Sequence, residues 1–533
     1  MLKIHLKFSY ILKFLILVTF VPKVFCSSCE EDAFGVTCNT IADLLQFPRP
    51  AEQRIVNVRG LDDSVIEDFI CDEPKFRNFS SVTKLWLSNV RLRRITDKCL
   101  KGLDKIEQID LGVNSLTAIN MSVFRASPAM KIQHIFMRNN RILEIDFANE
   151  QFEALEGLYL TNNGLRTIQI TSKILPKVNH LVIDVNLISS FKIESQTLYS
   201  LDMSYNRIQS FQGSDLVAPA LMVFFLQNNL LTTLSPEMLI NLPILHVTYL
   251  SENSLTKVSF PKLKHLNWLD LERNAIKSLN DVNVTAVEQI SNLNLNSNDI
   301  RQLNDDGFIF RNLTQFSCDF CSIQSIDPHF FANNMRHLNR LSLASNNLTS
   351  SDIFKGEKTF ELTNIDLSNN DIRAIGGGDF DRLTKLTHIL LDNNKISEID
   401  EGAFNATNEI QFVSLINNTL FQLPENLFEA TPLLRTLQLS GNYLSYLPLH
   451  ESNSKTFSKL EEFLIDRNPL QCKCVELIKS WTERNNISLT INNENMTNGN
   501  HSICINNEQG CQKDVGREFV YGNILKNEED KND

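Results

Sequence analysis

The stretch LEGLYLTNNGLRTI (155–168) decides the fold, because its spacing of apolar residues recurs along most of the chain. The same order, L-x-x-L-x-L-x-x-N-x-L-x-x-I/L, returns in LTNIDLSNNDIRAI (362–375), LTHILLDNNKISEI (386–399) and LRTLQLSGNYLSYL (434–447). Self-similarity at a fixed period is the signature of a solenoid, in which each unit buries its apolar edge against its neighbours. The sequence therefore predicts one long repeat architecture.

The second apolar position of the pattern locates seventeen units with an average spacing of about 24 residues. These positions are Leu85, Ile109, Ile135, Leu158, Leu181, Leu201, Phe224, Thr248, Leu269, Leu293, Phe316, Leu341, Ile365, Ile389, Val413, Leu437 and Phe463.

The L-x-L part of each unit predicts a short strand whose alternate residues face opposite sides. We expect the leucines to point into the core and the x residues to form a concave outer surface. The Asn follows where the chain turns away, and its amide can bond backbone groups that the turn leaves without partners. Asn fills this position in fifteen of the seventeen units; the exceptions are Val90 and Cys321.

Phenylalanine recurs at one slot on the far side of the units, which accounts for much of the high Phe content of 34 residues. We expect these rings to stack as a core spine beneath the convex loops. They are Phe308, Phe330, Phe380, Phe404 and Phe428.

The pattern resembles the leucine-rich repeat. The resemblance implies an α/β fold: a horseshoe solenoid with a parallel concave β-sheet and disulfide-bonded caps at both ends. The expected organisation is a signal peptide (1–26), an N-terminal cap (27–81), about 17 repeats (82–470), a cysteine-rich C-terminal cap (471–511) and a short polar tail (512–533).

The N-terminal segment MLKIHLKFSYILKFLILVTFVPKVFCSS has a basic start, an apolar run and small residues after Cys26, which predicts a cleaved signal peptide. The run is shorter than the roughly 20 apolar residues of a membrane span. The terminal KNEEDKND lacks the apolar tail of a lipid-anchor signal. We expect a secreted, extracellular protein with no membrane anchor. Its formal net charge of −12 argues against a nucleic-acid partner.

Two cysteines lie inside the repeats, in SCDFCS (317–322). Cys318 takes the third apolar position of the strand and Cys321 takes the Asn position, so both side chains should point inward. We expect free, buried thiols, because the register places no further ligands nearby for a metal site. A local disulfide is the minor alternative.

The other eight mature cysteines lie near the two ends. In the N-terminal cap we expect Cys29 to pair with Cys38 and Cys71 with Cys99. At the other end, NPLQCKCVELIKSWTERNN closely resembles the C-terminal cap of extracellular leucine-rich repeat proteins. The resemblance implies the pairs Cys472–Cys504 and Cys474–Cys511. Sequence alone allows three pairings, and zinc bound by the four cysteines is the alternative.

N-x-S/T sequons predict a glycoprotein. They begin at Asn78, Asn120, Asn283, Asn312, Asn347, Asn405, Asn417, Asn486, Asn495 and Asn500.

The outward residues of the strands carry aromatic side chains in the N-terminal half and mostly polar ones in the C-terminal half. An exposed aromatic stripe predicts a partner-binding surface. The alternative is that the rings pack across strands and stabilise the sheet. The candidate partner-binding residues are Trp86, Phe136, Tyr159, Val182, Phe225, Tyr249 and Trp268.

No catalytic constellation is evident. His134 and His180 belong to the outward columns, but the spacing places no Ser or Cys nucleophile with them. We therefore expect no enzymatic activity, no cofactor and no metal.

The whole plan of residues 54–511 resembles secreted insect leucine-rich repeat proteins, in particular mosquito leucine-rich immune proteins and Toll-type receptor ectodomains. The resemblance rests on the LxxLxLxxN units and the NPLxCxC cap. It implies binding of protein or microbial-surface partners as a recognition or scaffold factor in innate immunity. An extracellular matrix or cell-adhesion ligand and an enzyme inhibitor are the alternatives. Many such immune proteins end in coiled coils, whereas no heptads follow Cys511 here, so a dimer or a complex with another secreted protein stays open.

Overall fold

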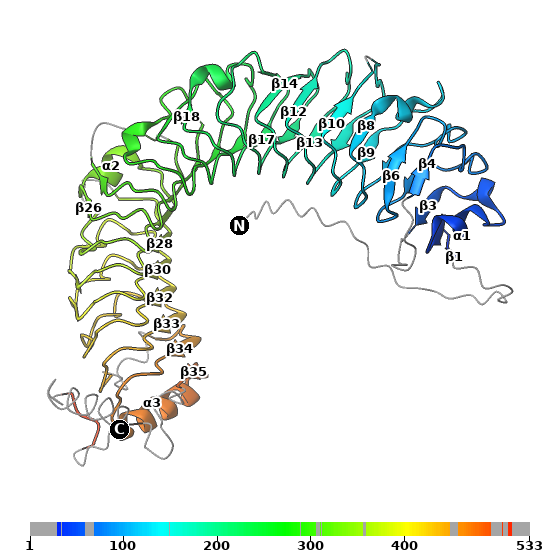
Figure 1. Ribbon diagram of the computed structural model, residues 1–533. Helices are drawn as coiled ribbons and strands as arrows, with labels where there is room; N and C mark the ends of the chain where they lie inside the picture. Colours follow the sequence, from blue (N-terminus) through cyan, green and yellow to red (C-terminus); the bar gives the residue numbers. More distant parts are fainter. Residues whose placement is uncertain are drawn as a thin grey trace, which may run out of the picture.

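The computed structural model describes residues 29–33, 35–58, 69–148, 150–287, 289–304, 310, 312–354, 359–447, 457–491, 504 and 510–513. They form an open arch of stacked turns with strands along its inner side (Figure 1). The expected horseshoe solenoid is therefore confirmed. The predicted signal peptide and most of the polar tail lie outside the described residues.

Each of the seventeen predicted units contributes one strand to a single sheet on the inner side of the arch. Neighbouring strands are parallel and in matching register, so that Leu158 of one unit pairs with Leu181 of the next. The unit strands are β5 (Lys84–Trp86), β7 (Gln108–Asp110), β9 (His134–Phe136), β11 (Gly157–Tyr159), β13 (His180–Val182), β15 (Ser200–Asp202), β17 (Val223–Phe225), β19 (Val247–Tyr249), β21 (Trp268–Asp270), β23 (Asn292–Asn294), β25 (Gln315–Ser317), β27 (Arg340–Ser342), β28 (Asn364–Asp366), β30 (His388–Leu390), β32 (Phe412–Ser414), β33 (Thr436–Gln438) and β34 (Glu462–Leu464).

Four strands from the two ends extend this sheet to 21 strands among the described residues. At the N-terminal end, β1 (Cys29–Glu31) pairs antiparallel with β2 (Gly35–Cys38), which pairs parallel with β3 (Ile55–Val58), and β3 pairs with β5. At the C-terminal end, β35 (Ser488–Thr490) pairs with β34. The end segments therefore close the solenoid partly by continuing its sheet.

The outer side of the arch carries short helices and small two- and three-stranded sheets. The strands are β4 (Phe69–Cys71), β6 (Leu92–Ile95), β8 (Ala118–Asn120), β10 (Glu144–Asp146), β12 (Thr167–Ile170), β14 (Ser190–Glu194), β16 (Leu216–Val217), β18 (Thr233–Leu234), β20 (Lys257–Ser259), β22 (Val282–Asn283), β24 (Gln302–Leu303), β26 (Ser325–Ile326), β29 (Ala374–Ile375) and β31 (Glu398–Ile399). The α-helices are α1 (Ile41–Leu45), α2 (Phe330–Asn334) and α3 (Cys472–Arg484), and the 3₁₀-helices are η1 (Pro50–Glu52), η2 (Met121–Arg125), η3 (Pro236–Leu239) and η4 (Leu279–Asp281).

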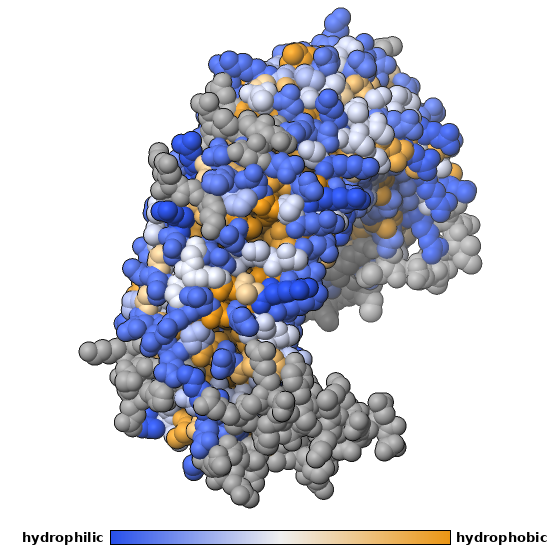
Figure 2. Space-filling model, turned by 90° about the vertical axis from the view of Figure 1, so that its left-hand side faces the viewer, coloured by the Kyte–Doolittle hydropathy of each residue, from blue (hydrophilic) through white to orange (hydrophobic). Residues whose placement is uncertain are grey.

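The core runs the whole length of the arch between its inner and outer sides. All seventeen residues at the second apolar position are at most 2% exposed, as the alternation of the strands requires. On the outer side, Phe380 stacks on Phe404 and Phe404 on Phe428, with ring centroids 5.9 and 5.7 Å apart. The predicted Phe spine is confirmed for these residues; Phe308 lies outside the described part. Polar residues cover most of the outer flank of the C-terminal half, with apolar strips between them (Figure 2).

A column of Asn side chains, the Asn ladder, links the units where the chain leaves each strand. Asn370 is a representative member and is 6% exposed. Its Oδ1 accepts the backbone N–H of Leu348 in the preceding unit at 3.0 Å. Its Nδ2 donates to the carbonyl oxygens of Leu343, at 2.9 Å in the preceding unit, and Leu367, at 3.1 Å in its own unit. One amide thus satisfies buried backbone groups of two successive units, which would otherwise be costly.

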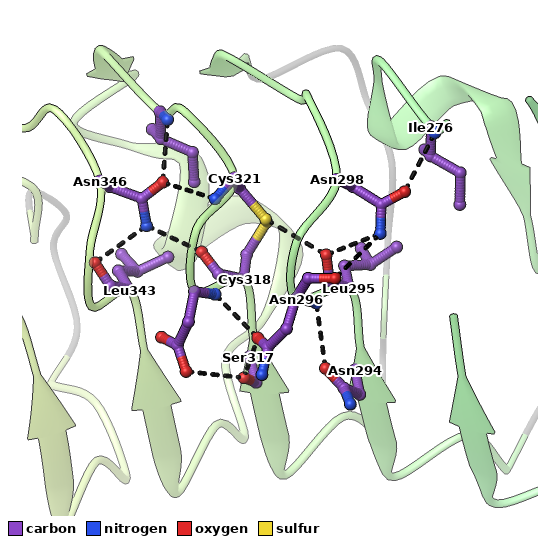
Figure 3. Close-up of a disulfide and its surroundings, with 12 residues drawn as sticks. Ile276, Asn294, Leu295, Asn296, Asn298, Ser317, Cys318, Cys321, Leu343 and Asn346 are labelled. Carbon is purple, nitrogen blue, oxygen red and sulfur yellow. Dashed lines mark hydrogen bonds between the residues drawn. A yellow bond between two sulfur atoms is a disulfide. The ribbon is translucent and has the colours of Figure 1, made fainter. Parts of the chain in front are cut away.

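In the two units without a ladder Asn, backbone N–H groups are bonded by the Asn of the next unit instead. The N–H groups of Val90 and Leu92 both donate to Oδ1 of Asn114 in the next unit, at 3.0 and 2.9 Å. The N–H groups of Cys321 and Ile323 likewise share Oδ1 of Asn346, at 3.0 and 2.9 Å (Figure 3). In both units the next Asn therefore accepts two bonds instead of one.

At Cys321 the backbone also replaces the missing amide toward the preceding unit. The Cys321 carbonyl oxygen accepts the N–H of Ile300 at 3.0 Å, the role that Asn Oδ1 has elsewhere. The sulfur of Cys321 lies 3.2 Å from the Leu295 carbonyl oxygen, near where an amide nitrogen would sit. That carbonyl still accepts Nδ2 of Asn298 at 2.8 Å (Figure 3). The unit keeps its place in the stack without an Asn.

The expectation of free thiols at Cys318 and Cys321 is wrong, because the structure joins them in a disulfide. Both residues are fully buried, as the register predicts. The turn that brings each ladder Asn within hydrogen-bonding distance of the carbonyl three residues back also brings Cys321 next to Cys318. Their Cα atoms are 5.5 Å apart, within the usual range for a disulfide. Inward orientation therefore implied proximity of the two sulfurs.

The caps contain the four other disulfides named above: Cys29–Cys38, Cys71–Cys99, Cys472–Cys504 and Cys474–Cys511. Helix α3 begins at Cys472 and packs Ile478 into the core, where Trp481 meets Phe463 edge-on. This helix covers the apolar end of the last repeat.

We predict that Asn370→Ala lowers the free energy of unfolding by about 1–3 kcal/mol for each buried backbone group left without a partner. Urea denaturation measures the loss. The matched control is Asn408→Ala at an exposed position, expected to change stability by no more than about 0.5 kcal/mol. Equal effects of the two substitutions would contradict a structural role for the ladder.

We predict that Cys318 and Cys321 resist alkylation in denatured, unreduced protein, because the disulfide leaves no thiolate to react. Mass spectrometry of the digested protein should find one intact peptide link between them. Both should be alkylated once the protein is reduced first. Labelling without reduction would overturn the disulfide.

Candidate functional site: the concave face of the arch

The middle outward residues of the unit strands form one column along the inner face. Phe136, Tyr159, Val182, Phe225 and Tyr249 all belong to it and are partly exposed. Trp86 lies in the same column, but Asp110 separates it from Phe136. Trp268 lies in the neighbouring column, at the start of β21, and is 38% exposed. The structure thus places six of the seven predicted residues in one column and one beside it.

The aromatic residues of this column form two stacked pairs rather than a continuous stripe. Phe136 and Tyr159 stack with centroids 4.4 Å apart. Phe225 and Tyr249 stack with centroids 4.9 Å apart and parallel planes. Stacking at this distance stabilises the sheet and presents flat apolar faces to solvent at the same time. The packing of rings across strands is therefore confirmed, and partner binding by these residues stays a prediction.

Two outward residues lie between the two aromatic pairs. They are Val182 and Asp202, whose strands lie between those of Tyr159 and Phe225. Burial raises the pKa of Asp202, while hydrogen bonds from Ser204 oppose the rise. The neighbouring Asp184 raises it further. Asp184 Oδ1 is buried and accepts no hydrogen bond from the described residues. The surface between the aromatic pairs therefore carries carboxylates beside apolar rings.

Gly157 is a position of the concave face that the sequence analysis missed. It occupies the first outward position of β11, between His134 and His180 in the paired strands. A Cβ atom there would lie 2.5 Å from Nδ1 of His134 and 2.7 Å from the Tyr159 ring. The missing side chain therefore makes room for these rings. A lone Gly in an outward column was the available signal, since such a residue marks close approach.

Both histidines beside Gly157 have lowered pKa values, which favours their neutral form. Partial burial lowers the pKa of His134 and of His180 below the ordinary value of 6.5, and the nearby charge of Glu156 partly opposes this. The Tyr159 hydroxyl has a raised pKa for the same reason, the loss of hydration. The N-terminal half of the face therefore carries negative charge from carboxylates and little positive charge from its histidines.

A second feature of the concave face lies beyond Trp268, where a hollow of about 390 Å³ opens over strands β21 to β30. Its lining includes Trp268, Asn292, Gln315, Arg340 and His388. Sequence analysis found Trp268 as an outward residue but not the hollow beside it.

The described residues hold no group of three or more His, Cys, Asp and Glu side chains arranged to bind a metal ion. None of the described helices is long and apolar enough to cross a membrane.

The sequons are distributed unevenly along the chain. Residues 121–282, which contain both aromatic pairs, have no N-x-S/T sequence, although Asn120 and Asn283 flank this segment directly. The eight sequon asparagines within the described residues are all exposed. Asn495 and Asn500 lie outside that part. No glycan attached at a sequon would therefore originate within the segment that carries the aromatic pairs.

Comparison with protein families identifies the architecture. The family described as leucine rich repeat matches residues 196–255, 360–420 and 385–444. The family described as BspA type leucine rich repeat region, six copies, matches residues 70–210 and 240–360. The chain is a leucine-rich repeat protein. No curated protein matches it significantly over its sequence.

Several solved structures are similar to this chain. One is a chain of the Toll–Spatzle complex of Drosophila in its glycosylated form, with a TM-score of 0.59 and 17% identity over 85% of this chain and 68% of that one. Another is a leucine-rich repeat protein of Leptospira interrogans, with a TM-score of 0.53 and 20% identity over 85% of this chain and 99% of that one. The structure of TLR13 with ssRNA13 has a TM-score of 0.48 and 20% identity, and the match spans 78% of this chain but only 64% of that one.

We predict that Asp202→Asn raises the melting temperature of this leucine-rich repeat protein at pH 7 and has little effect near pH 4. Because the folded-state pKa of Asp202 is raised, the unfolded chain ionises first as the pH rises. Stability is therefore lost as the pH rises from about 3.8 through the raised pKa, and Asn, which keeps an acceptor oxygen, avoids that loss. Thermal melts of both proteins across this range measure the difference.

The exposed Asp97→Asn is the control and should show no such pH-dependent gain. A lower melting temperature for Asp202→Asn at pH 7 would contradict the assigned effect of burial.

Proposed function

We propose that this leucine-rich repeat protein is a secreted glycoprotein that binds a protein partner through the N-terminal half of its concave face. The observation that carries the proposal is the two stacked pairs Phe136–Tyr159 and Phe225–Tyr249, both partly exposed on this face. Aromatic residues such as Tyr are among those most often found at the centre of protein interfaces. The carboxylate of Asp202, between the two pairs, would favour a basic side chain of the partner, because guanidinium and ammonium groups bind both carboxylates and aromatic faces.

The sequon pattern supports this placement. Glycans on Asn120 and Asn283 would flank the segment that carries both aromatic pairs, and no other sequon lies between them. A bulky glycan within an interface would prevent close packing. The five disulfides support an extracellular setting, because oxidising compartments allow such bonds to persist.

A role in innate immunity is the biological setting that we propose. The Toll–Spatzle complex, whose chain shares this fold, is described as a molecular hub in Drosophila development and innate immunity. Induction of the transcript after infection, with the protein in circulating fluid, would support the immune role. Constant expression with the protein held in tissue would instead favour adhesion in development.

We predict that Phe225→Ala with Tyr249→Ala weakens binding of the protein partner at least about 30-fold, since buried aromatic anchors often contribute 2 kcal/mol or more. The partner is first isolated from extracellular fluid with the tagged wild-type protein, and its affinity is then measured for each variant. The inward residues stay intact, so the double variant should be secreted and should melt cooperatively.

The matched control is Phe421→Ala with Tyr443→Ala, another stacked Phe–Tyr pair with centroids 5.3 Å apart in the C-terminal half. It should leave affinity unchanged. Normal affinity in a folded Phe225–Tyr249 variant, or an equal loss in the control, would overturn the assignment of this surface.

A further inference from the structure

The hollow beyond Trp268 has a simple structural cause. In the middle outward column, β25 and β27 end in Ser317 and Ser342, whose side chains are short. Larger side chains surround them, with Trp268 at one end and Leu390 at the other. The volume of about 390 Å³ falls in the range of small-molecule sites. The hollow spans six strands, or about 24 Å along the sheet, so it suits an extended ligand better than a compact one.

Trp268 provides a flat apolar platform at one end. Its side chain is 38% exposed although its strand lies inside the sheet. An indole face is electron-rich and packs against groups that carry polarised C–H bonds. The faces of pyranose rings have this character, whereas their edges carry hydroxyl groups.

Planar polar side chains follow Trp268 along the same edge of the hollow. The first outward position of the next five strands is filled by Asn292, Gln315, Arg340, Asn364 and His388. Amides and imidazole both donate and accept hydrogen bonds, as sugar hydroxyls do.

One of these groups has an unused acceptor. Asn292 donates from Nδ2 to Ser291 Oγ at 2.8 Å, but its Oδ1 accepts no hydrogen bond from the described residues. A ligand hydroxyl entering the hollow would supply the missing donor after a small rotation of the amide.

Arg340 favours a ligand that carries negative charge. Its neighbours in the sheet are the uncharged Gln315 and Asn364, and no carboxylate of the described residues lies within ion-pair distance of it. Burial lowers the pKa of His388, and the nearby charge of Arg340 lowers it further. The planar fork of an exposed guanidinium suits bidentate binding of a carboxylate.

The carboxylates of the hollow are already engaged within the sheet. Asp366 accepts the N–H and Oγ–H of Ser368, at 2.9 and 2.6 Å. Asp319, in the adjacent column, accepts Oγ–H of Ser342 at 2.6 Å and the N–H of Ala344 at 2.7 Å. They keep the region from being strongly basic, which disfavours a polyphosphate chain but permits a ligand with a single acidic group.

We propose that this hollow binds an oligosaccharide, with one pyranose ring on Trp268 and the carboxylate of a uronic or sialic acid residue on Arg340. The intervening amides bind the hydroxyl groups of the sugars between them. The hollow begins at Trp268, on the strand next to that of Tyr249, so it borders the surface proposed for a protein partner.

The test uses the full-length protein on an array of defined oligosaccharides that includes neutral, carboxylated and sulfated members. The wild type should prefer carboxylated members. Arg340→Gln should weaken binding of carboxylated members about tenfold or more, because hydrogen bonds to charged groups are lost, and should leave neutral members unaffected. Trp268→Ala should weaken both kinds. Trp268→Phe, which keeps an apolar ring, should fold even if the Ala variant does not and should show an intermediate loss.

Two control variants match the size and charge changes elsewhere on the concave face. Trp86→Ala removes the outward Trp of the first unit, and Arg138→Gln removes an Arg that lies 3.7 Å from Asp110. Both should keep wild-type sugar binding. Failure of the wild type to retain any oligosaccharide, undiminished binding by Trp268→Phe and Arg340→Gln, or a preference for sulfated over carboxylated members would overturn the proposal. The proposal would also be overturned if RNA or a phosphopeptide bound in preference to the oligosaccharides when both were offered. None of these outcomes depends on the protein partner proposed for the aromatic pairs.

Discussion

A side-chain amide in fifteen of the seventeen units is the interaction on which the rest of this structure depends. Where the chain leaves a strand, backbone groups point into the core, and burying them without partners would be costly. The ladder Asn supplies an acceptor to the unit before it and donors to carbonyl groups of both units. Because each amide spans two units, the same hydrogen bonds that complete a turn also set the distance and register to its neighbour.

The outward residues of the concave surface can therefore differ from unit to unit. Inward leucines and ladder amides keep the stack in place, so the outward residues are under no comparable packing constraint. The two halves of the arch use that freedom differently. The N-terminal half carries stacked ring pairs around Val182 and Asp202, whereas the following units carry short Ser side chains that open a hollow beside Trp268. One scaffold can thereby hold an aromatic surface and a polar hollow side by side.

The sequence predicted those features that repeat. The strand positions, the buried second apolar residue, the Asn column and the Phe380–Phe404–Phe428 spine each recur with the period, so a single register assigned them together. The disulfide of Cys318 and Cys321 was only the minor alternative, because the inward direction of the two side chains was not followed to the closeness of the two sulfur atoms. Gly157 and the hollow were missed because they arise from single small residues whose effect depends on side chains in neighbouring units. Strands β1 to β3 and β35 lie outside the repeat pattern, so its periodicity could not predict the position of every one of them.

Hydrogen exchange of the native protein, resolved to single amides by mass spectrometry, tests the central role of the ladder most directly. The decisive groups are the backbone N–H donors to ladder Oδ1 atoms, such as those of Leu165, Ile188 and Leu348. If the ladder holds the units together, these amides exchange as slowly as those of the concave strands, and opening them requires separation of neighbouring units. Exchange as fast as that of exposed loop amides would show that the apolar core alone stabilises the stack and would contradict the account.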